Sequence, residues 1–129
     1  TDILYLDPPY NERQYLPNYH ILETIAKYDN PTIKGVTGIR DYENKKSTFC
    51  NPKTALRDFE LIIQKSNFKH LILSYNSEGI MSQEDIIALM SNYGKVEFEQ
   101  FLYARFKSNN KGLSKTKKTV YEQVYILTK

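Results

Sequence analysis

The sequence predicts an α/β fold with a mainly parallel sheet that ends in an antiparallel hairpin. Apolar runs typical of buried strands alternate along the chain with segments whose apolar residues recur at helical spacing. The last two strand-like runs follow each other directly and are joined by a polar connection, which favours a hairpin. With 129 residues, of which 40% are hydrophobic, residues 1–129 can form one packed unit.

The first expected strand is the apolar run Ile3–Leu6, and it must end at Pro8 and Pro9. Proline has no N–H to donate to a sheet and does not continue a helix. Asp7, the proline carbonyls and Tyr10 are therefore presented at the carboxyl end of a strand, where open α/β sheets bind ligands. The chain begins inside this strand without an initiator methionine, which we interpret as a fragment of a longer domain.

The next fifty residues are expected to contain one short helix between two loops. Residues 11–19 are rich in tyrosine and contain Pro17, which indicates a loop. Apolar residues recur at helical spacing over residues 19–28, before the stop signal Asp29-Asn30-Pro31. Residues 32–52 lack apolar periodicity and contain two glycines, and loops of this length are usually functional or disordered. We therefore expect residues 32–52 to be mobile or ordered by a partner.

The remaining elements alternate regularly. An apolar face from Ala55 to Ile63 predicts a helix that begins after Pro52 and ends before Ser66. A second helix is expected over residues 83–92, because Ser82 is a favourable N-cap. Three further strands are expected over residues 69–75, 96–107 and 119–128.

The group formed by Asp7, Pro8, Pro9 and Tyr10 suits a flat ligand that carries an amino group. An ionised aspartate and a backbone carbonyl both accept hydrogen bonds, so together they can hold the two hydrogens of an amine. An aromatic ring one step along the chain can stack on a heterocycle, which is worth about 1–3 kcal/mol per base. These residues therefore indicate a nucleobase with an exocyclic amine as the ligand.

The motif Asp7-Pro8-Pro9-Tyr10 behind a strand resembles the catalytic motif of amino-methyltransferases that act on adenine N6 in DNA. Its continuation to Tyr15 and the later segment Asn18-Tyr19-His20 are similar to the Dam-like adenine-specific branch. So are residues 73–79, 103–107 and 121–122. The resemblance covers nearly the whole chain, although only the first motif is individually specific.

This resemblance implies a methyl transfer from S-adenosylmethionine to an adenine extruded from double-stranded DNA, in a restriction-modification system. Asp7, Pro8, Pro9 and Tyr10 would be the catalytic residues, and Asp7 and Tyr10 would also face the cofactor. The family binds its cofactor through a Gly-rich loop, which is absent from this sequence. The fold would be the C-terminal half of a Rossmann-like methyltransferase, with the cofactor-binding and target-recognition parts missing upstream. The chain alone is then expected to bind S-adenosylmethionine weakly or not at all.

The formal charge of +3 is too small to indicate a nucleic-acid partner, but the basic residues are clustered. Once DNA is suspected, two groups become candidates for phosphate contacts. The first group is a run without acidic residues and consists of Lys107, Lys111, Lys115, Lys117 and Lys118. The second group lies in the long loop and consists of Arg40, Lys45 and Lys46. A solvated loop is the alternative for the first group.

Other functional classes stay open. Related motifs serve RNA bases and protein amides, and the chain could instead be a non-catalytic remnant or interaction module. Tyr75 and Asn76 either line the adenine pocket or serve the core and a turn. Cys50 is the only cysteine, and neither His20 nor His70 has a second ligand at metal spacing, so no metal site is expected. We expect a cytoplasmic, bacterial-type protein with no membrane segment, and an open sheet edge that could pair two copies.

Overall fold

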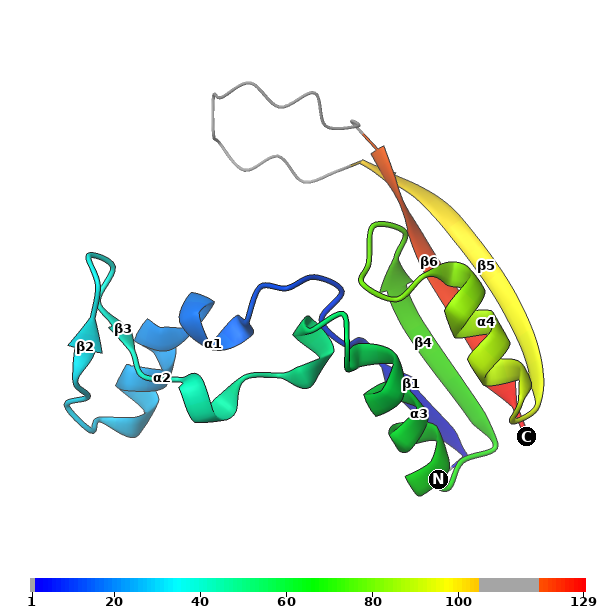
Figure 1. Ribbon diagram of the computed structural model, residues 1–129, viewed down its shortest axis with the longest axis horizontal. Coiled ribbons are helices and arrows are strands. Elements are labelled where there is room, and N and C mark those ends of the chain that lie inside the picture. Colours follow the sequence, from blue (N-terminus) through cyan, green and yellow to red (C-terminus); the bar gives the residue numbers. More distant parts are fainter. Residues whose placement is uncertain (1, 105–118) are drawn as a thin grey trace.

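The structure is a computed structural model that describes residues 2–104 and 119–129 (Figure 1). Its main sheet contains β1 (Ile3–Leu6), β4 (His70–Asn76), β5 (Lys95–Ala104) and β6 (Thr119–Thr128), in the order β1-β4-β6-β5. β1 pairs with β4 in parallel, whereas β6 is antiparallel to both of its neighbours. Three strands therefore point the same way and only β6 opposes them, which confirms the mixed α/β class and the hairpin.

The position of β6 corrects one expectation. The antiparallel strand was expected at the end of the sheet, but β6 lies between β4 and β5, and β5 forms the edge. The burial of the two strands gives the reason. Val120, Gln123, Tyr125 and Leu127 of β6 are buried, whereas β5 has no buried residue. The strand with the stronger alternation of buried side chains therefore takes the central position.

Two helices cover one face of this sheet. α3 (Ala55–Lys65) and α4 (Gln83–Ser91) bury their apolar faces against alternate residues of β4 and β6. As predicted, Ser82 caps α4, because its hydroxyl accepts a hydrogen bond from the Asp85 N–H at 3.1 Å. The fully buried core residues come from these four elements: Ala55, Phe59, Ile63, Leu71, Leu73, Ile86, Met90, Tyr125 and Leu127.

The opposite face of the sheet is not covered by a helix of the described residues. Successive strand side chains point to opposite faces, so Ile3 and Tyr5 lie on the face away from α3. Their exposed fractions are 56% and 61%. Ile72 and Ile126, which share the Tyr5 row of the sheet, are only partly buried. β1 is also an edge strand of the described sheet.

Residues 15–46 form an arm that extends from the sheet (Figure 1). The arm contains α1 (Tyr15–Asn18), α2 (His20–Lys27), the hairpin β2 (Ile33–Lys34) and β3 (Ile39–Arg40), and the 3-10 turn η1 (Glu43–Lys45). The helix predicted over residues 19–28 is confirmed. Residues 32–52, which were expected to be a loop, form this hairpin and two 3-10 turns. Strands of two residues are too short to show any periodicity.

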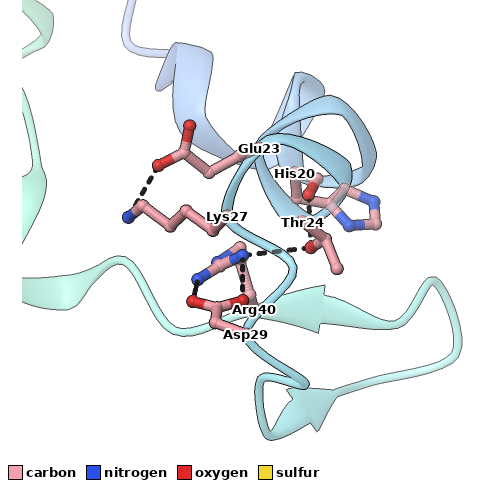
Figure 2. A network of polar contacts seen from close by, with 6 residues as sticks. All are labelled: His20, Glu23, Thr24, Lys27, Asp29 and Arg40. Atoms are coloured by element: carbon pink, nitrogen blue, oxygen red, sulfur yellow. Dashed lines mark hydrogen bonds and ion pairs between the residues drawn. The ribbon is translucent and has the colours of Figure 1, made fainter.

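Polar contacts hold the arm together, since none of its residues is buried. The Arg40 guanidinium donates two hydrogen bonds to the Asp29 carboxylate, at 3.1 and 2.5 Å, and one to the Thr24 hydroxyl, at 3.1 Å. Thr24 in turn donates to the His20 carbonyl, so α2 and the hairpin are joined (Figure 2). A Glu23–Lys27 ion pair at 2.7 Å lies beside this network.

Gly35 and Gly38 connect the two strands of the arm, with φ angles of +71° and +64°. Other residues adopt these angles at a cost, so the glycines permit the tight hairpin. None of the helices in the described part of the chain is long and apolar enough to cross a membrane.

Candidate functional site

The motif Asp7-Pro8-Pro9-Tyr10 leaves the carboxyl end of β1 beside the carboxyl end of β4. The register pairs Leu6 with Leu73, so the two strands end at the same edge. A backbone hydrogen bond from the Ile80 N–H to the Tyr10 carbonyl, 2.9 Å long, ties the motif to the turn after β4. Asp7 is exposed and Tyr10 retains 40% of its surface. A carboxylate and an aromatic ring are thus exposed together at this edge of the sheet.

A pocket of about 280 Å³ opens beside the motif, at the free edge of β1. The walls combine strand, motif and helix residues: Tyr5, Leu6, Asp7, Pro8, Pro9, Phe49 and Ile62. Most of these side chains are apolar, and Asp7 contributes the charged group. Phe49 and Ile62 were not identified as site residues from the sequence, because they approach the motif only through the packing of α3 and its preceding turn.

The turn after β4 is built by Tyr75 and Asn76, which take the core and turn roles that the sequence left open. Tyr75 is buried, and its hydroxyl accepts a hydrogen bond from the Met81 N–H at 3.2 Å. The Asn76 amide donates to Glu122 at 3.0 Å, and its oxygen accepts from the Glu78 N–H at 2.9 Å. These contacts fix the turn after β4, and the Ile80 N–H of that turn donates to the Tyr10 carbonyl.

A second segment holds the residues directly behind the motif. We call residues 47–50 the strap; its last three residues form the 3-10 turn η2 (Thr48–Cys50). The Gln14 side chain accepts a hydrogen bond from the Ser47 N–H at 2.7 Å and donates one to the Ser47 carbonyl at 3.1 Å. The buried Cys50 thiol donates to the Arg13 carbonyl at 3.4 Å. Burial raises the pKa of this thiol, so Cys50 is a packing residue.

Tyr15 ends the motif continuation noted in the sequence, but it was not assigned there to the site. Burial, followed by the negative charge of Asp7, raises the pKa of its hydroxyl. The Tyr15 ring is 6.2 Å from the ring of Tyr19. The spacing of Tyr10, Tyr15 and Tyr19 along a tyrosine-rich stretch was the available signal.

Of the two predicted basic groups, only the one in the arm lies within the described residues. The run from Lys107 to Lys118 lies outside the described residues. In the arm, the Arg40 side chain is 14% exposed and engaged with Asp29. Lys46 pairs with Glu43 at 2.6 Å but remains largely exposed. The nearby Lys27 ammonium lowers the pKa of Lys45, so these two like charges lie close together.

The two histidines form local contacts. His20 contributes its backbone carbonyl to the arm, and the His70 ring lies 3.0 Å from the Thr128 hydroxyl. Within residues 2–104 and 119–129, no group of three potential ligands could hold a metal ion.

A family model and several named relatives match this sequence. The family model for D12 class N6 adenine-specific DNA methyltransferases matches residues 1–89, which include the motif and its pocket. The type II methyltransferase M.FokI from Planomicrobium okeanokoites is 46% identical over 113 residues, which are 85% of this chain and 18% of that protein. M.NlaIII from Neisseria lactamica is 41% identical over 129 residues, covering 99% of this chain and 38% of that protein.

The modification methylase StsI from Streptococcus sanguinis is 41% identical over 130 residues, with 98% of this chain and 19% of that protein covered. The chain thus spans less than two fifths of the length of each of these relatives. No solved structure matches the chain significantly. The match to the family model covers well over half of the chain, so the chain belongs to the D12 class N6 adenine-specific DNA methyltransferase family.

Proposed function

We propose that this chain carries the catalytic motif of a site-specific DNA methyltransferase that modifies adenine N6. The observation that supports this most is the exposed Asp7–Tyr10 motif at the shared edge of β1 and β4, within the residues that match the family. The named relatives are type II methyltransferases and modification methylases, which supports a role in a restriction-modification system.

The motif residues would act on the exocyclic amine of an adenine extruded from double-stranded DNA. The Asp7 carboxylate and the Pro8 carbonyl accept the two N–H groups of the amine, which draws the nitrogen lone pair out of conjugation with the ring. Tyr10 stacks on the base through its exposed ring. S-adenosylmethionine would supply the methyl group when bound, and the two acceptors would hold the amine nitrogen toward that group. Fixed acceptors and alignment carry the catalysis.

S-adenosylmethionine fits the residues of this chain only in part. The pocket beside Asp7 offers apolar walls and one carboxylate, and its volume of about 280 Å³ is near the lower limit for a ligand site. When bound, this cofactor supplies an electrophilic methyl group on a sulfonium. Asp7 and the pocket wall would face that end, with Tyr10 on the base side. We propose that the remaining contacts come from another part of the polypeptide, so residues 1–129 alone bind the cofactor weakly or not at all.

The activity can be tested on the full-length protein with unmethylated DNA and a methyl donor labelled with tritium. N6-methyladenine is the expected product after hydrolysis of the DNA, and Asp7→Ala should abolish it. Asp2→Ala is the matched control, since Asp2 is an exposed aspartate at the other end of β1 that forms an ion pair with Lys69 at 3.0 Å. Labelling of RNA or protein in place of DNA would contradict the proposal, as would full activity of Asp7→Ala.

We further propose that basic residues contact DNA phosphates: Lys45 and Lys46 on the arm, with Lys107, Lys111, Lys115, Lys117 and Lys118. Arg40 is left out of this set, because its contacts with Asp29 and Thr24 support an internal role. Replacement of Lys115, Lys117 and Lys118 by Gln in the full-length protein should reduce the slope of log affinity against log salt by about 0.9 for each phosphate that is no longer neutralised. An unchanged slope would assign them to a solvated loop.

We also propose that residues 1–129 are the catalytic-motif half of a Rossmann-like domain. Helices cover only one face of the described sheet, while Ile3 and Tyr5 are exposed on the other. Doubly wound domains carry helices on both faces. The rest of the polypeptide would then supply the second layer and a strand beside β1, in preference to pairing of two copies. Hydrogen exchange on the full-length protein should show protection also of those β1 amides that point away from β4. Rapid exchange there would contradict this arrangement.

A further inference from the structure

The residues directly behind Tyr10 are held at two places by contacts that are distant in sequence. On one side, the Tyr10 carbonyl accepts a hydrogen bond from the Ile80 N–H at 2.9 Å. On the other, Gln14 forms a reciprocal pair with the backbone of Ser47. Between them, the Asn11 side chain accepts from the Arg13 N–H at 2.9 Å and closes a local turn. The backbone from Tyr10 to Gln14 is therefore fixed while the ring of Tyr10 stays exposed.

The Gln14–Ser47 pair is suited to this task. It uses both functions of the Gln14 amide, and both groups are partly buried, where hydrogen bonds are stronger and unpaired polar groups are costly. The strap that contains Ser47 also carries Phe49, which lines the pocket beside Asp7. One contact thus sets the position of the Tyr10 loop relative to the pocket wall.

We propose that Gln14 is a positioning residue, which aligns the loop of Tyr10 for stacking on the extruded adenine by clamping it to Ser47. This inference rests on the proposed methyltransferase function. The clamp acts on the alignment of the base at the moment of transfer and leaves the phosphate contacts unaffected. Its loss is therefore expected to lower the rate of methyl transfer much more than DNA affinity.

Ser47 permits a matched pair of variants. Both of its clamp groups belong to the backbone, so Ser47→Ala should retain the clamp and wild-type activity. Compared with Ser47→Ala, Ser47→Pro removes only the N–H in addition, because the Ser47 φ of −71° already suits proline and Lys46 has the extended conformation that proline requires of its predecessor. The proline variant therefore breaks the 2.7 Å bond with little backbone strain.

Gln14 gives a graded series on the other partner. Gln14→Glu keeps an acceptor for the Ser47 N–H and removes the donor, so an intermediate rate is expected. Gln14→Ala removes both hydrogen bonds. Gln64→Ala serves as a control, since this exposed glutamine also donates a side-chain hydrogen bond, to Tyr93 at 2.8 Å, away from the motif. Gln14→Ala combined with Ser47→Pro should be no slower than the slower single variant, because both substitutions disrupt the same clamp.

The experiment measures single-turnover methyl transfer by the full-length protein on its mapped DNA sequence, with DNA affinity and thermal stability in parallel. Gln14→Ala and Ser47→Pro should slow transfer by about tenfold to a hundredfold. A duplex with 2-aminopurine in place of the target adenine should show altered fluorescence with these variants only. If wild-type protein forms no N6-methyladenine, the proposed function fails. If it does and both variants transfer at the wild-type rate, or lose only thermal stability, the clamp proposal is overturned.

Discussion

The α/β core and the arm are stabilised by opposite means. The core buries apolar side chains from α3, α4, β4 and β6, and nine of these are almost completely inaccessible. The arm has no buried residue and depends on Arg40, Asp29 and Thr24 for its cohesion. Burial of apolar surface gives cooperative stability, whereas exposed polar contacts contribute little to global unfolding. The candidate site lies between them, at the junction of a rigid scaffold and a weakly held arm.

The largest loss of stability is expected from the removal of a core side chain. Phe59 is completely buried on the core-facing side of α3, so Phe59→Ala should lower the free energy of unfolding by about 3–5 kcal/mol. Leu61 lies two positions along the same helix with 39% of its surface exposed, and Leu61→Ala should cost much less. Urea denaturation of both variants checks this. Equal losses would mean that α3 does not form the core as described.

The pH dependence of stability offers the second test. Burial, followed by the charge of Glu84, raises the pKa of Tyr125 from 10.0 to about 12. As the pH rises, this tyrosine ionises in the unfolded chain before it ionises in the folded chain. Its contribution to the free energy of unfolding is therefore intact below pH 10 and is lost as the pH rises through 12. The loss approaches about 2 kcal/mol. Chemical denaturation at about pH 9 and about pH 11.5, on either side of the unfolded-state pKa, should show a smaller decrease in the free energy of unfolding for Tyr125→Phe than for the wild type. An identical decrease would contradict the burial of this hydroxyl.

A smaller effect is expected at the start of α4. Ser82→Ala removes the acceptor of the Asp85 N–H and should cost about 1 kcal/mol of stability. Ser91, near the end of the same helix, donates its hydroxyl to the Ile87 carbonyl, which already belongs to the helix. Ser91→Ala should therefore be nearly neutral. Thermal unfolding of the two variants distinguishes a true cap from a generic effect of serine removal.

The arm should respond without any change in global stability. Arg40→Ala removes one hydrogen bond from the hairpin to Thr24 of α2 and two to Asp29 behind that helix, so hydrogen exchange in residues 20–40 should accelerate while the unfolding transition stays in place. Arg57 is a suitable control, because it pairs with Asp58 on the exposed side of α3. A shifted global transition in Arg40→Ala would remove the distinction between arm and core.

Local patterns in the sequence were sufficient to predict the core elements. β6 coincides with the expected range 119–128, and α4 begins behind its predicted cap at Ser82. Apolar periodicity and capping depend on neighbouring residues, so they are visible in a single sequence. The insertion of β6 between β4 and β5 was not, because strand order depends on how deeply each strand can be buried in the assembled sheet.

The site was predictable only where its residues are contiguous. Asp7, Pro8, Pro9 and Tyr10 form one stretch at a strand end and were identified together. Gln14 and Ser47 are 33 positions apart and are joined by two hydrogen bonds, both of which involve the backbone of Ser47. A backbone contact of this kind leaves no preference for a residue type at position 47, and the short hairpin of the arm likewise has no periodic pattern.

The meeting of Gln14 and Ser47 has a consequence for how such a chain can vary. The two ends of the arm lie within hydrogen-bonding distance of each other, so residues 15–46 leave and re-enter the scaffold at nearly one point. An insertion with adjoining ends imposes no fixed span, and its length can change at small entropic cost. Residues 15–46 can therefore be replaced by a segment of different length while the motif keeps its geometry.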